Sequence, residues 1–225
     1  MTRPIDGPPP PTALEAIAAR RTIRRFDPDR PVPDDDLRSL LALATLAPSA
    51  FNLQPWRFVV VRDLRNRRRL RACTFGEARI TEAPVVLIVL GYLEPDRLDL
   101  DRVLDRQLDL GAIPPDLARR FRAEVPRLWA RGDDRATRAT RPAIHAAATL
   151  MIAASAIGLG TALLEEFDPD QVRRAFGIPD DHAIAALLAL GHPADRPPFP
   201  GRFPLDHTCY AEHFGQPWPG DDEDR

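Results

Sequence analysis

Five arginines lie close together near the start of the chain, and no other group of residues suggests chemistry as clearly. The stretch ARRTIRRFDPDR covers residues 19–30. The whole chain carries a formal charge of −2 at pH 7, from 31 basic and 33 acidic residues, and it contains no lysine. Such local positive charge suits a helix end, a polyanion, a membrane surface or one small phosphate.

Two interpretations of these arginines are open. In the first, Arg20 and Arg21 end a helix, where cations complement the helix dipole, and the later arginines are solvated. In the second, an extended backbone after the helix places Thr22 and Arg24 on one side and Ile23 on the other. Arg20, Thr22 and Arg24 would then offer two guanidinium forks and a hydroxyl to one phosphate. A nucleic-acid duplex would need a much wider basic surface.

The loop LAPSAFNLQPWRFVVV, residues 46–61, is the second informative stretch. Pro48 and Ser49 end a helix, and Asn52 and a following glutamine offer amide groups beside Trp56. Amide donors and acceptors next to an aromatic ring suit the edge of a planar heterocycle. The alternative is ordinary turn chemistry, with Asn52 capping the backbone and Trp56 in the core.

Side chains for acid–base, nucleophilic or metal chemistry are not evident. The sequence has no G-x-S-x-G motif, no P-loop lysine and no G-x-G-x-x-G motif after a strand. Glu165 and Glu166 are adjacent on an expected strand and should point to opposite faces. Cys73 and Cys209 are too far apart in sequence to indicate a disulfide framework or a metal site. Enzymes whose cofactor carries the reaction need few catalytic side chains, which fits this pattern.

The composition predicts one soluble globular domain without a nucleic-acid or membrane partner. The 225 residues are 44% hydrophobic and 28% charged, with a pI near 6.2. The first residues lack the apolar segment of a signal peptide, so we expect a cytoplasmic protein. The longest apolar stretch, residues 143–160, contains polar side chains and suits a buried helix better than a membrane span.

The pattern along the chain alternates helices with short apolar strands. Thr12 and Glu15 form a capping box for a helix that ends near Arg20, and Asp34 is an expected N-cap for a helix that Pro48 stops. Further elements are expected as strands over 58–61, 84–92, within 158–167 and over 183–191, and as helices over 63–72, 142–157 and from Asp168.

Three segments have a different character. Residues 1–11 form a proline-rich tail that should be disordered. The charged segment 93–141 should be helical, with Trp129 as its one large apolar anchor, and the helix over 142–157 should be covered all round. The last thirty residues are rich in proline and should form an extended arm without regular structure.

Four blocks of the sequence resemble the nitroreductase family of FMN-dependent oxidoreductases. They read RRTIRRFDPDRPVP, LATLAPSAFNLQPWRFVVV, EAPVVLIVL and IGLGTALLEEFDPDQVRRAFGIPDDHAIAALLALGHP. The resemblance covers about residues 14–204. It implies an α+β fold whose central, mainly antiparallel sheet is covered by helices, in a homodimer with FMN at the subunit interface. The domain would span residues 12–204, with 93–141 as a variable lid and 205–225 as a C-terminal arm and acidic tail.

The same resemblance assigns the cofactor site by position. Basic and hydroxyl residues of the first block, with one late arginine, match the phosphate and ribityl contacts. Residues of the second block match a loop that the partner subunit lays against the flavin. The implied site residues are Arg20, Arg21, Thr22, Arg24 and Arg202 at the phosphate, Pro48, Ser49 and Asn52 on the loop, Arg79 as a basic flavin contact after the third helix, and Leu164, Glu165 and Glu166 on the strand whose backbone approaches the flavin ring near N5.

Two positions depart from the family's pattern. The family usually has a small residue where Phe51 stands, so its ring would either stack near the flavin and gate the site or pack in the dimer seam. Glycine is common where Glu166 stands. A carboxylate there would disfavour anionic reduced flavin and lower its potential.

The activity implied is a ping-pong transfer of hydride from NADH or NADPH, through flavin N5, to a nitroaromatic, quinone or enone. No side chain is expected to be catalytic itself. Two alternatives remain: a specialised flavin reaction of the same family, such as dehydrogenation, dehalogenation or ring cleavage, or a protein that stores or senses FMN without turnover.

Overall fold

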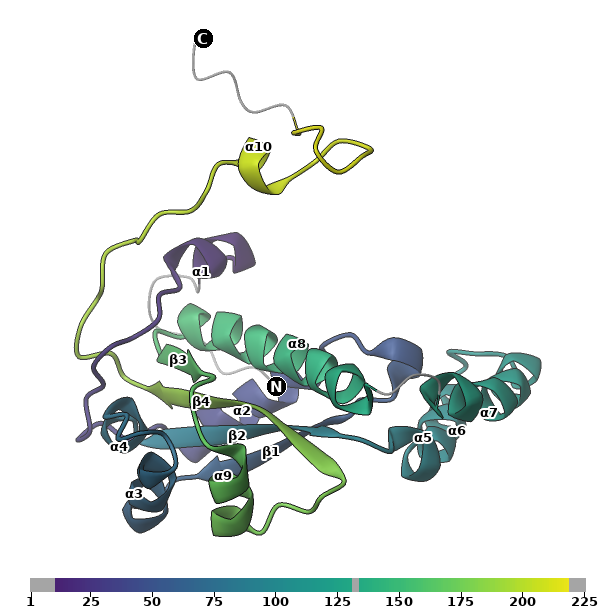
Figure 1. Ribbon diagram of the computed structural model, residues 1–225, viewed down its shortest axis with the longest axis horizontal. Coiled ribbons are helices and arrows are strands. Elements are labelled where there is room, and N and C mark those ends of the chain that lie inside the picture. The colour runs from purple at the N-terminus through teal and green to yellow at the C-terminus, as the bar shows by residue number, and fades with distance from the viewer. Residues whose placement is uncertain (1–10, 131–133, 219–225) are drawn as a thin grey trace.

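A four-stranded antiparallel sheet forms the centre of the chain, in a computed structural model that describes residues 11–130 and 134–218 (Figure 1). Residues 1–10 of the tail expected over 1–11, and the acidic end after residue 218, lie outside the described residues. The strand order is β1-β2-β4-β3, and each neighbouring pair is antiparallel. The α+β class with an antiparallel sheet is therefore confirmed. The strands are β1 (Trp56–Val61), β2 (Val85–Tyr92), β3 (Gly160–Leu164) and β4 (His182–Gly191).

Helices cover both faces of this sheet. The helices are α1 (Ala13–Ala19), α2 (Asp34–Ala44), α3 (Leu64–Ala72), α4 (Arg79–Glu82), α5 (Pro95–Leu98), α6 (Leu100–Asp109), α7 (Pro115–Ala130), α8 (Arg135–Ala156), α9 (Pro169–Phe176) and α10 (Leu205–Thr208), with a 3₁₀ turn at Ala50–Asn52.

Alternate residues of the central strands enter two separate cores. Val85, Leu87 and Val89 of β2 pack with residues of α2 and α8 on one face. Val86 and Ile88 point to the other face, where they pack with residues of α3, α4 and α9. Because β2 is buried on both faces along its length, it has the continuous apolar sequence expected of an interior strand.

The long helix α8 differs from the helix expected over 142–157. It begins at Arg135, and the side chain of Asp134 caps it by accepting a hydrogen bond from the backbone N–H of Thr137. Pro142 lies inside the helix instead of at its start. The helix is also not covered all round, because one stripe of its surface is exposed. That stripe contains Arg141, His145 and Ala148.

A glycine explains how the early turns of α8 reach the sheet. A Cβ atom on Gly91 of β2 would lie 2.5 Å from the backbone carbon of Ala139. Only a residue without a side chain permits this approach. The contact packs the turns before Pro142 against β2, so the helix extends further toward its N-terminus than the proline suggested.

One of the two expected caps forms, and the helix expected from Asp168 begins one residue later with Asp168 as its N-cap. Thr12 and Glu15 make both bonds of a capping box, and Asp168 caps α9 through the N–H groups of Asp170 and Gln171. The expected cap at Asp34 is wrong, because Pro33 occupies the N-cap position. Asp34 instead opens an acidic first turn, where negative charge complements the helix dipole.

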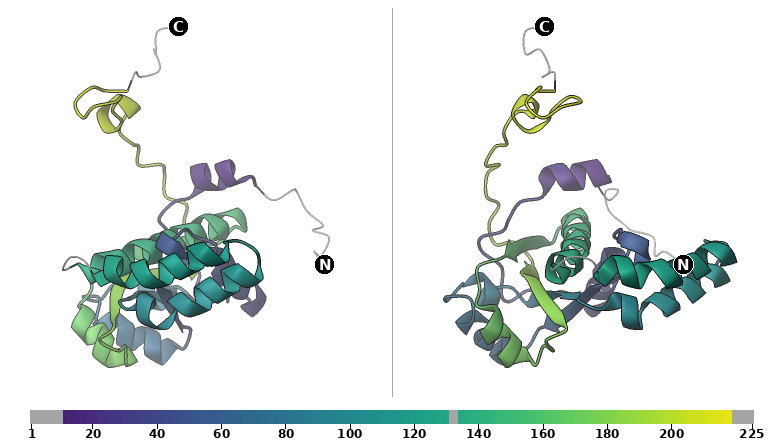
Figure 2. Two further views of the ribbon diagram at one scale, coloured as in Figure 1. Left: turned by 90° about the vertical axis from the view of Figure 1, so that its right-hand side faces the viewer. Right: turned by 45° about the vertical axis from the view of Figure 1, so that its right-hand side comes forward.

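Helices α5, α6 and α7 project from the body, and α6 and α7 share a small separate core with the loop before β1 (Figures 1 and 2). The indole N–H of Trp129 donates to the carbonyl of Leu93 over 2.9 Å. Trp129 is not the one apolar anchor, because further side chains share its core. These are Leu53, Leu100, Leu104 and Val125, with Phe51, Ile113 and Phe121 at the edge.

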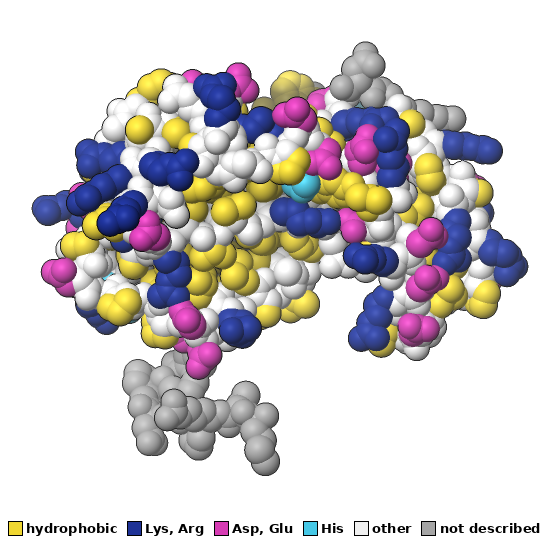
Figure 3. Space-filling view, turned by 90° about the horizontal axis from the view of Figure 1, so that it is seen from below, with side chains coloured by type: hydrophobic (Ala, Val, Ile, Leu, Met, Phe, Trp, Pro, Cys, Tyr) yellow, Lys and Arg dark blue, Asp and Glu magenta, His cyan; other side chains and the backbone are white. Residues whose placement is uncertain are grey.

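The face seen in Figure 3 carries arginine and carboxylate side chains close together, with apolar surface between them. A notch on this face separates the projecting helices from the body. No helix within the described ranges is both long and apolar enough to cross a membrane.

The residues after β4, from 192 to 218, leave the body as an arm (Figures 1 and 2). It is not without regular structure, as α10 forms directly after Pro204. A proline before the first turn removes no helical hydrogen bond, so the proline-rich sequence permits this short helix. The arm exposes several large apolar side chains, namely Phe199, Phe203, Leu205, Tyr210, Phe214 and Trp218.

We predict that Gly160 and Ile23 are energetically coupled. A Cβ on Gly160 would lie 2.4 Å from Cγ1 of Ile23. Gly160→Ala should therefore cost about 1–3 kcal/mol through overpacking, and Ile23→Ala about 2–5 kcal/mol through a cavity. Urea unfolding of the double variant should show less than the summed cost, because the new methyl group enters the space that Ile23 leaves. Strictly additive costs would contradict this contact.

Candidate flavin site

The arginine segment is extended and lies along the edge of β3. Thr22 forms a parallel bridge with Thr161, and the backbone N–H of Ile23 donates to the carbonyl of Thr161 over 3.0 Å. Ile23 is 5% exposed and enters the core, whereas Thr22 and Arg24 are exposed. The alternation that the second interpretation required is therefore present.

The start of the C-terminal arm runs beside this segment. The N–H of Asp27 donates to the carbonyl of His192, and the N–H of Ala194 donates to the carbonyl of Arg25, each over 2.9 Å. This pairing carries the following residues of the arm to the arginines. Arg202 is thereby placed near residues that precede it by about 180 positions in sequence.

One cavity of about 240 Å³ collects the residues that the sequence assigned to a phosphate. Its walls come from the extended segment, from the start of α4 and from the arm. The lining residues are Arg20, Arg21, Thr22, Arg24, Arg79, Pro197, Pro198, Pro200 and Arg202. We call this the phosphate cavity.

The arginines of the phosphate cavity differ in how they are held. Arg21 donates to the carbonyls of Ala18 and Arg20 over 2.7 and 2.8 Å, and Arg20 is the C-cap of α1, so both residues lie at the helix end as the first interpretation held. The guanidinium groups of Arg21 and Arg202 both lie over the ring of Phe199, at 4.8 and 5.4 Å from its centre. Such cation–π contacts fix arginine side chains at the rim of the cavity.

Arg20 provides the test of whether an anion fits. Its Nη1 atom is buried and has no hydrogen-bond partner among the described residues. Leaving a buried donor unpaired is costly, and for a charged donor the cost is higher. Arg20 lines the phosphate cavity as well as a smaller neighbouring cavity of about 150 Å³, so a phosphate bound in the first is one candidate for the missing acceptor. The donor set therefore fits a phosphate monoester.

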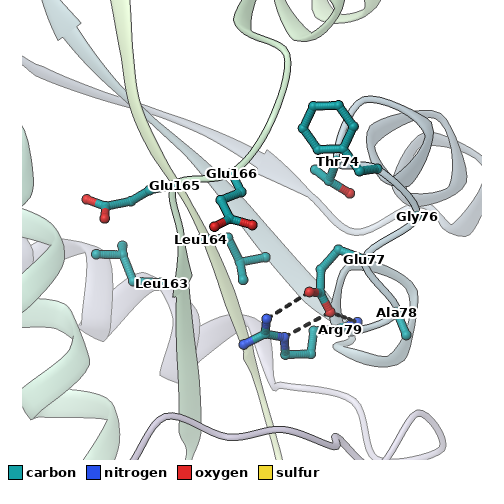
Figure 4. A pocket seen from close by; sticks show the side chains of 10 residues that line it. Thr74, Gly76, Glu77, Ala78, Arg79, Leu163, Leu164, Glu165 and Glu166 are labelled. Carbon is teal, nitrogen blue, oxygen red and sulfur yellow. Dashed lines mark hydrogen bonds and ion pairs between the residues drawn. The ribbon is translucent and has the colours of Figure 1, made fainter.

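A second, larger cavity of about 580 Å³ shares Arg79 with the first. We call it the ring cavity. It lies between the loop over residues 74–79 and the end of β3, residues 163–166 (Figure 4). Leu164 lines it, and the side chains of Glu165 and Glu166 diverge, with that of Glu166 directed toward the side of Arg79.

An ion pair fills one wall of the ring cavity. Oε1 and Oε2 of Glu77 accept from Nε and Nη2 of Arg79 over 2.9 and 2.7 Å, and Oε1 also accepts from the backbone N–H of Arg79 over 3.0 Å. These hydrogen bonds, chiefly those from the guanidinium, lower the pKa of Glu77 from its usual 4.5 to about 2, although partial burial opposes the shift. The same pairing raises the pKa of Arg79.

The loop residues of the second block lie elsewhere. Pro48, Ser49 and Phe51 line a third cavity of about 420 Å³, together with Trp129 and His145. Asn52 is exposed with φ +55°, and its side chain makes no hydrogen bond within the described ranges. Within one chain, the predicted site residues thus fall into two groups.

The structure decides one of the loop's open questions. Trp56 is 5% exposed in the core shared with α2 and α8, so the alternative is correct for Trp56, although its expected cap at Asn52 does not form among the described residues. Phe51 adopts φ +53°, and its ring meets that of Phe121 of α7 edge-on, with centres 5.3 Å apart. Neither interpretation of Phe51 anticipated this contact, which ties the loop to the projecting helices.

Two residues of the site were missed from the sequence. Phe199 lies in RPPFPGR, where an aromatic residue between two arginines is a weak signal for stacking. Glu77 stands two positions before Arg79, a spacing that indicates an ion pair only where a turn brings the two side chains together.

Comparison with known proteins decides the family. The sequence profile described as the nitroreductase family matches residues 17–192. The chain belongs to the nitroreductase family. NADH dehydrogenase of Thermus thermophilus is 39% identical to it over 202 residues, covering 87% of this chain and 94% of the relative. Within the family, 5,6-dimethylbenzimidazole synthase of Rhodospirillum rubrum is 30% identical over 202 residues, covering 80% and 82%.

Solved structures share the fold. A chain from Exiguobacterium sibiricum, determined in complex with FMN, matches with a TM-score of 0.80 and 24% identity, covering 88% of this chain and 95% of that one. The resemblance drawn from the four sequence blocks is therefore confirmed for both family and fold.

The Glu77–Arg79 pair should make stability depend on pH. The pKa of Glu77 is lowered on folding, so its contribution is complete above about pH 4.5 and is lost as the pH falls toward 2. About a quarter of each side chain is exposed, and we expect Glu77→Gln to lose on the order of 2–3 kcal/mol at neutral pH. Urea unfolding should show the two proteins converging near pH 2. Glu124→Gln, which alters an exposed pair on α7, is the control, and an equal acid response in Glu77→Gln and the parent protein would refute the assignment.

Proposed function

We propose that this nitroreductase-family protein is an FMN-dependent enzyme that moves a hydride from NADH or NADPH to a nitroaromatic, quinone or enone by a ping-pong cycle. The observation that carries the proposal is the phosphate cavity with its buried, unpaired Arg20 nitrogen, joined through Arg79 to a cavity of suitable size for a planar ring. The FMN complex of the Exiguobacterium neighbour and the name of the Thermus relative support the cofactor and the reductant.

The chain's own residues would bind and orient the cofactor. Arg20, Arg24 and Arg202 would donate charged hydrogen bonds to the phosphate, each contributing on the order of 1.5–3 kcal/mol. Phe199 holds two of the cavity's guanidiniums in place before an anion arrives, which reduces the entropy lost on binding. Ile23 and its bond to Thr161 fix the segment that carries these groups.

Reaction at the ring needs little from side chains. When bound, FMN supplies the chemistry, because N5 of its ring accepts a hydride and releases it to the next substrate. Leu164 and the backbone that follows it would form one wall of the ring site, and the loop over 74–79 the other. These walls would hold both substrates over one position and limit water. The proposed effect of Glu166 is to lower the flavin potential.

We also propose that the active form is a homodimer. Pro48, Ser49 and Phe51 line a cavity that shares no residue with the phosphate or ring cavity, so a second chain is needed to bring this loop to the cofactor. The exposed stripe of α8 borders the loop's cavity through Arg141 and His145. Apolar side chains on α1 and on the arm are also exposed, as Leu14 is 78% exposed.

A specialised reaction of the same family is the second candidate. The Rhodospirillum relative is named for a synthase and not for a reductase, and Glu166 departs from the family's usual glycine. Steady-state oxidation of NADH and NADPH with menadione or a nitrofuran separates the candidates. A yellow protein that releases FMN yet oxidises neither nicotinamide would favour the specialised reaction or a storage role.

Arg20→Gln should weaken the binding of FMN but not that of riboflavin. Losing one charged hydrogen bond to the phosphate should reduce affinity ten- to a hundredfold. Riboflavin, which lacks the phosphate, should bind the variant and the parent protein equally. Arg30→Gln alters an exposed arginine of the same cluster that lines no cavity described above, and it should leave both affinities unchanged. Equal losses for FMN and riboflavin would assign Arg20 to folding instead.

Ala148→Glu should weaken the dimer. Ala148 lies on the exposed stripe of α8, so the charge is tolerated in one chain but would be buried against a partner. Sedimentation equilibrium should show a dissociation constant raised at least tenfold, with loss of bound FMN. Ala136→Glu places the same charge at an exposed position in the first turn of α8 and should have no effect. A flavin-loaded monomer of the parent protein at micromolar concentration would contradict the dimer.

A further inference from the structure

The Glu77–Arg79 pair lies at the junction of the two cavities, since Arg79 lines both and Glu77 lines the ring cavity (Figure 4). Glu77 engages Nε, Nη2 and the backbone N–H of Arg79. Nη1 of Arg79 makes no hydrogen bond within the described part of the chain. The guanidinium is thus held in one orientation with a donor left over.

The charges around this pair do not favour a cation. Glu77 neutralises Arg79 at contact distance, and Glu82 of the same short helix adds further negative potential at the guanidinium. Arg71 acts in the opposite sense on Glu77. The carboxylate of Glu166 is directed toward this side of the ring cavity. The charged side chains that line the ring cavity are therefore negative as a whole, with Arg79 facing Glu77, Glu165 and Glu166, while the other arginines line the phosphate cavity on the far side of Arg79.

We propose that Glu77 lowers the reduction potential of the bound flavin. It does so by holding Arg79 in place as a hydrogen-bond donor while cancelling the positive charge of its guanidinium. The inference rests on the proposed function and adds Glu77, a residue that no sequence pattern assigned to the site. Reducing a flavin adds electrons to its ring, and a nearby uncompensated cation stabilises that added charge. A neutral ion pair stabilises that added charge far less. Glu77 accordingly keeps the flavin a stronger reductant than an unpaired Arg79 would.

Four proteins test this proposal as a charge cycle: the parent protein, Glu77→Gln, Arg79→Gln and the double variant. The midpoint potential of bound FMN is measured by spectroelectrochemical titration at neutral pH, together with the affinity for oxidised FMN. Glu77→Gln leaves the positive charge of Arg79 uncompensated. The affinity for reduced FMN relative to oxidised FMN should then rise about tenfold, which raises the midpoint potential by about 30 mV for a two-electron couple. Arg79→Gln leaves Glu77 unpaired and should shift the potential in the opposite direction.

The double variant restores a neutral pair and should return close to the parent potential. Glu124→Gln, whose partner Arg120 lies on the exposed side of α7, should not change the potential. Arg79→Gln retains Glu77 and tests the same electrostatics if Glu77→Gln proves too unstable. An unchanged or lowered potential in Glu77→Gln, or a double variant that deviates as far as either single variant, would overturn the proposal. A parent protein that binds no FMN would instead overturn the proposed function.

Discussion

The pairing of the arginine segment with the outer edge of β3 is the interaction on which the site depends. An edge strand presents unpaired N–H and C=O groups, and here Thr161 accepts from Ile23. Burying Ile23 beside Gly160 obliges the neighbouring side chains to face outward, which directs Thr22 and Arg24 to the phosphate cavity. The arm then pairs with the far end of the same segment. One short stretch of extended backbone thus assembles both halves of the phosphate cavity.

Electrostatics in this protein is arranged locally and not over the whole surface. The chain has a net charge of −2, yet five arginines line the phosphate cavity. Glu77 neutralises Arg79, the one of the five that also lines the ring cavity. Positive charge is thereby retained where a phosphate dianion would sit and removed where electrons would accumulate. The two cavities share a residue, but Glu77 makes them different environments.

The division of the predicted site residues between separate cavities has a structural cause. The loop with Ser49 is tied by Phe51 to α7, and α7 is packed on α6 away from the sheet. In one chain the loop accordingly lines a cavity that shares no residue with that of the arginines. In the proposed homodimer, the exposed stripe of α8 that borders the loop would be the surface on which the second chain completes the site.

The sequence by itself determined the features that arise from short-range interactions. The capping bonds at Thr12 and Asp168 join residues two to three positions apart, and the alternation at Ile23 follows from the two-residue period of an extended chain. The apolar runs of β2 and β4 likewise indicated interior strands. The motif blocks identified the family, whose profile matches residues 17–192.

Only the tertiary structure decided the features that depend on contacts between distant segments. Pro142 indicated a helix start, yet the approach of Ala139 to Gly91 of β2 stabilises the turns before it. Phe51 could not be assigned from its neighbours in sequence, because its partner Phe121 lies seventy positions away. Glu77 and Arg79 are near in sequence, but their proposed role follows from Arg79 bordering two cavities, one lined by residues from both ends of the chain and the other by residues 163–166. Local hydrogen bonds and periodicity depend on residues within short stretches of sequence. These contacts, in contrast, exist only once the sheet brings remote segments together.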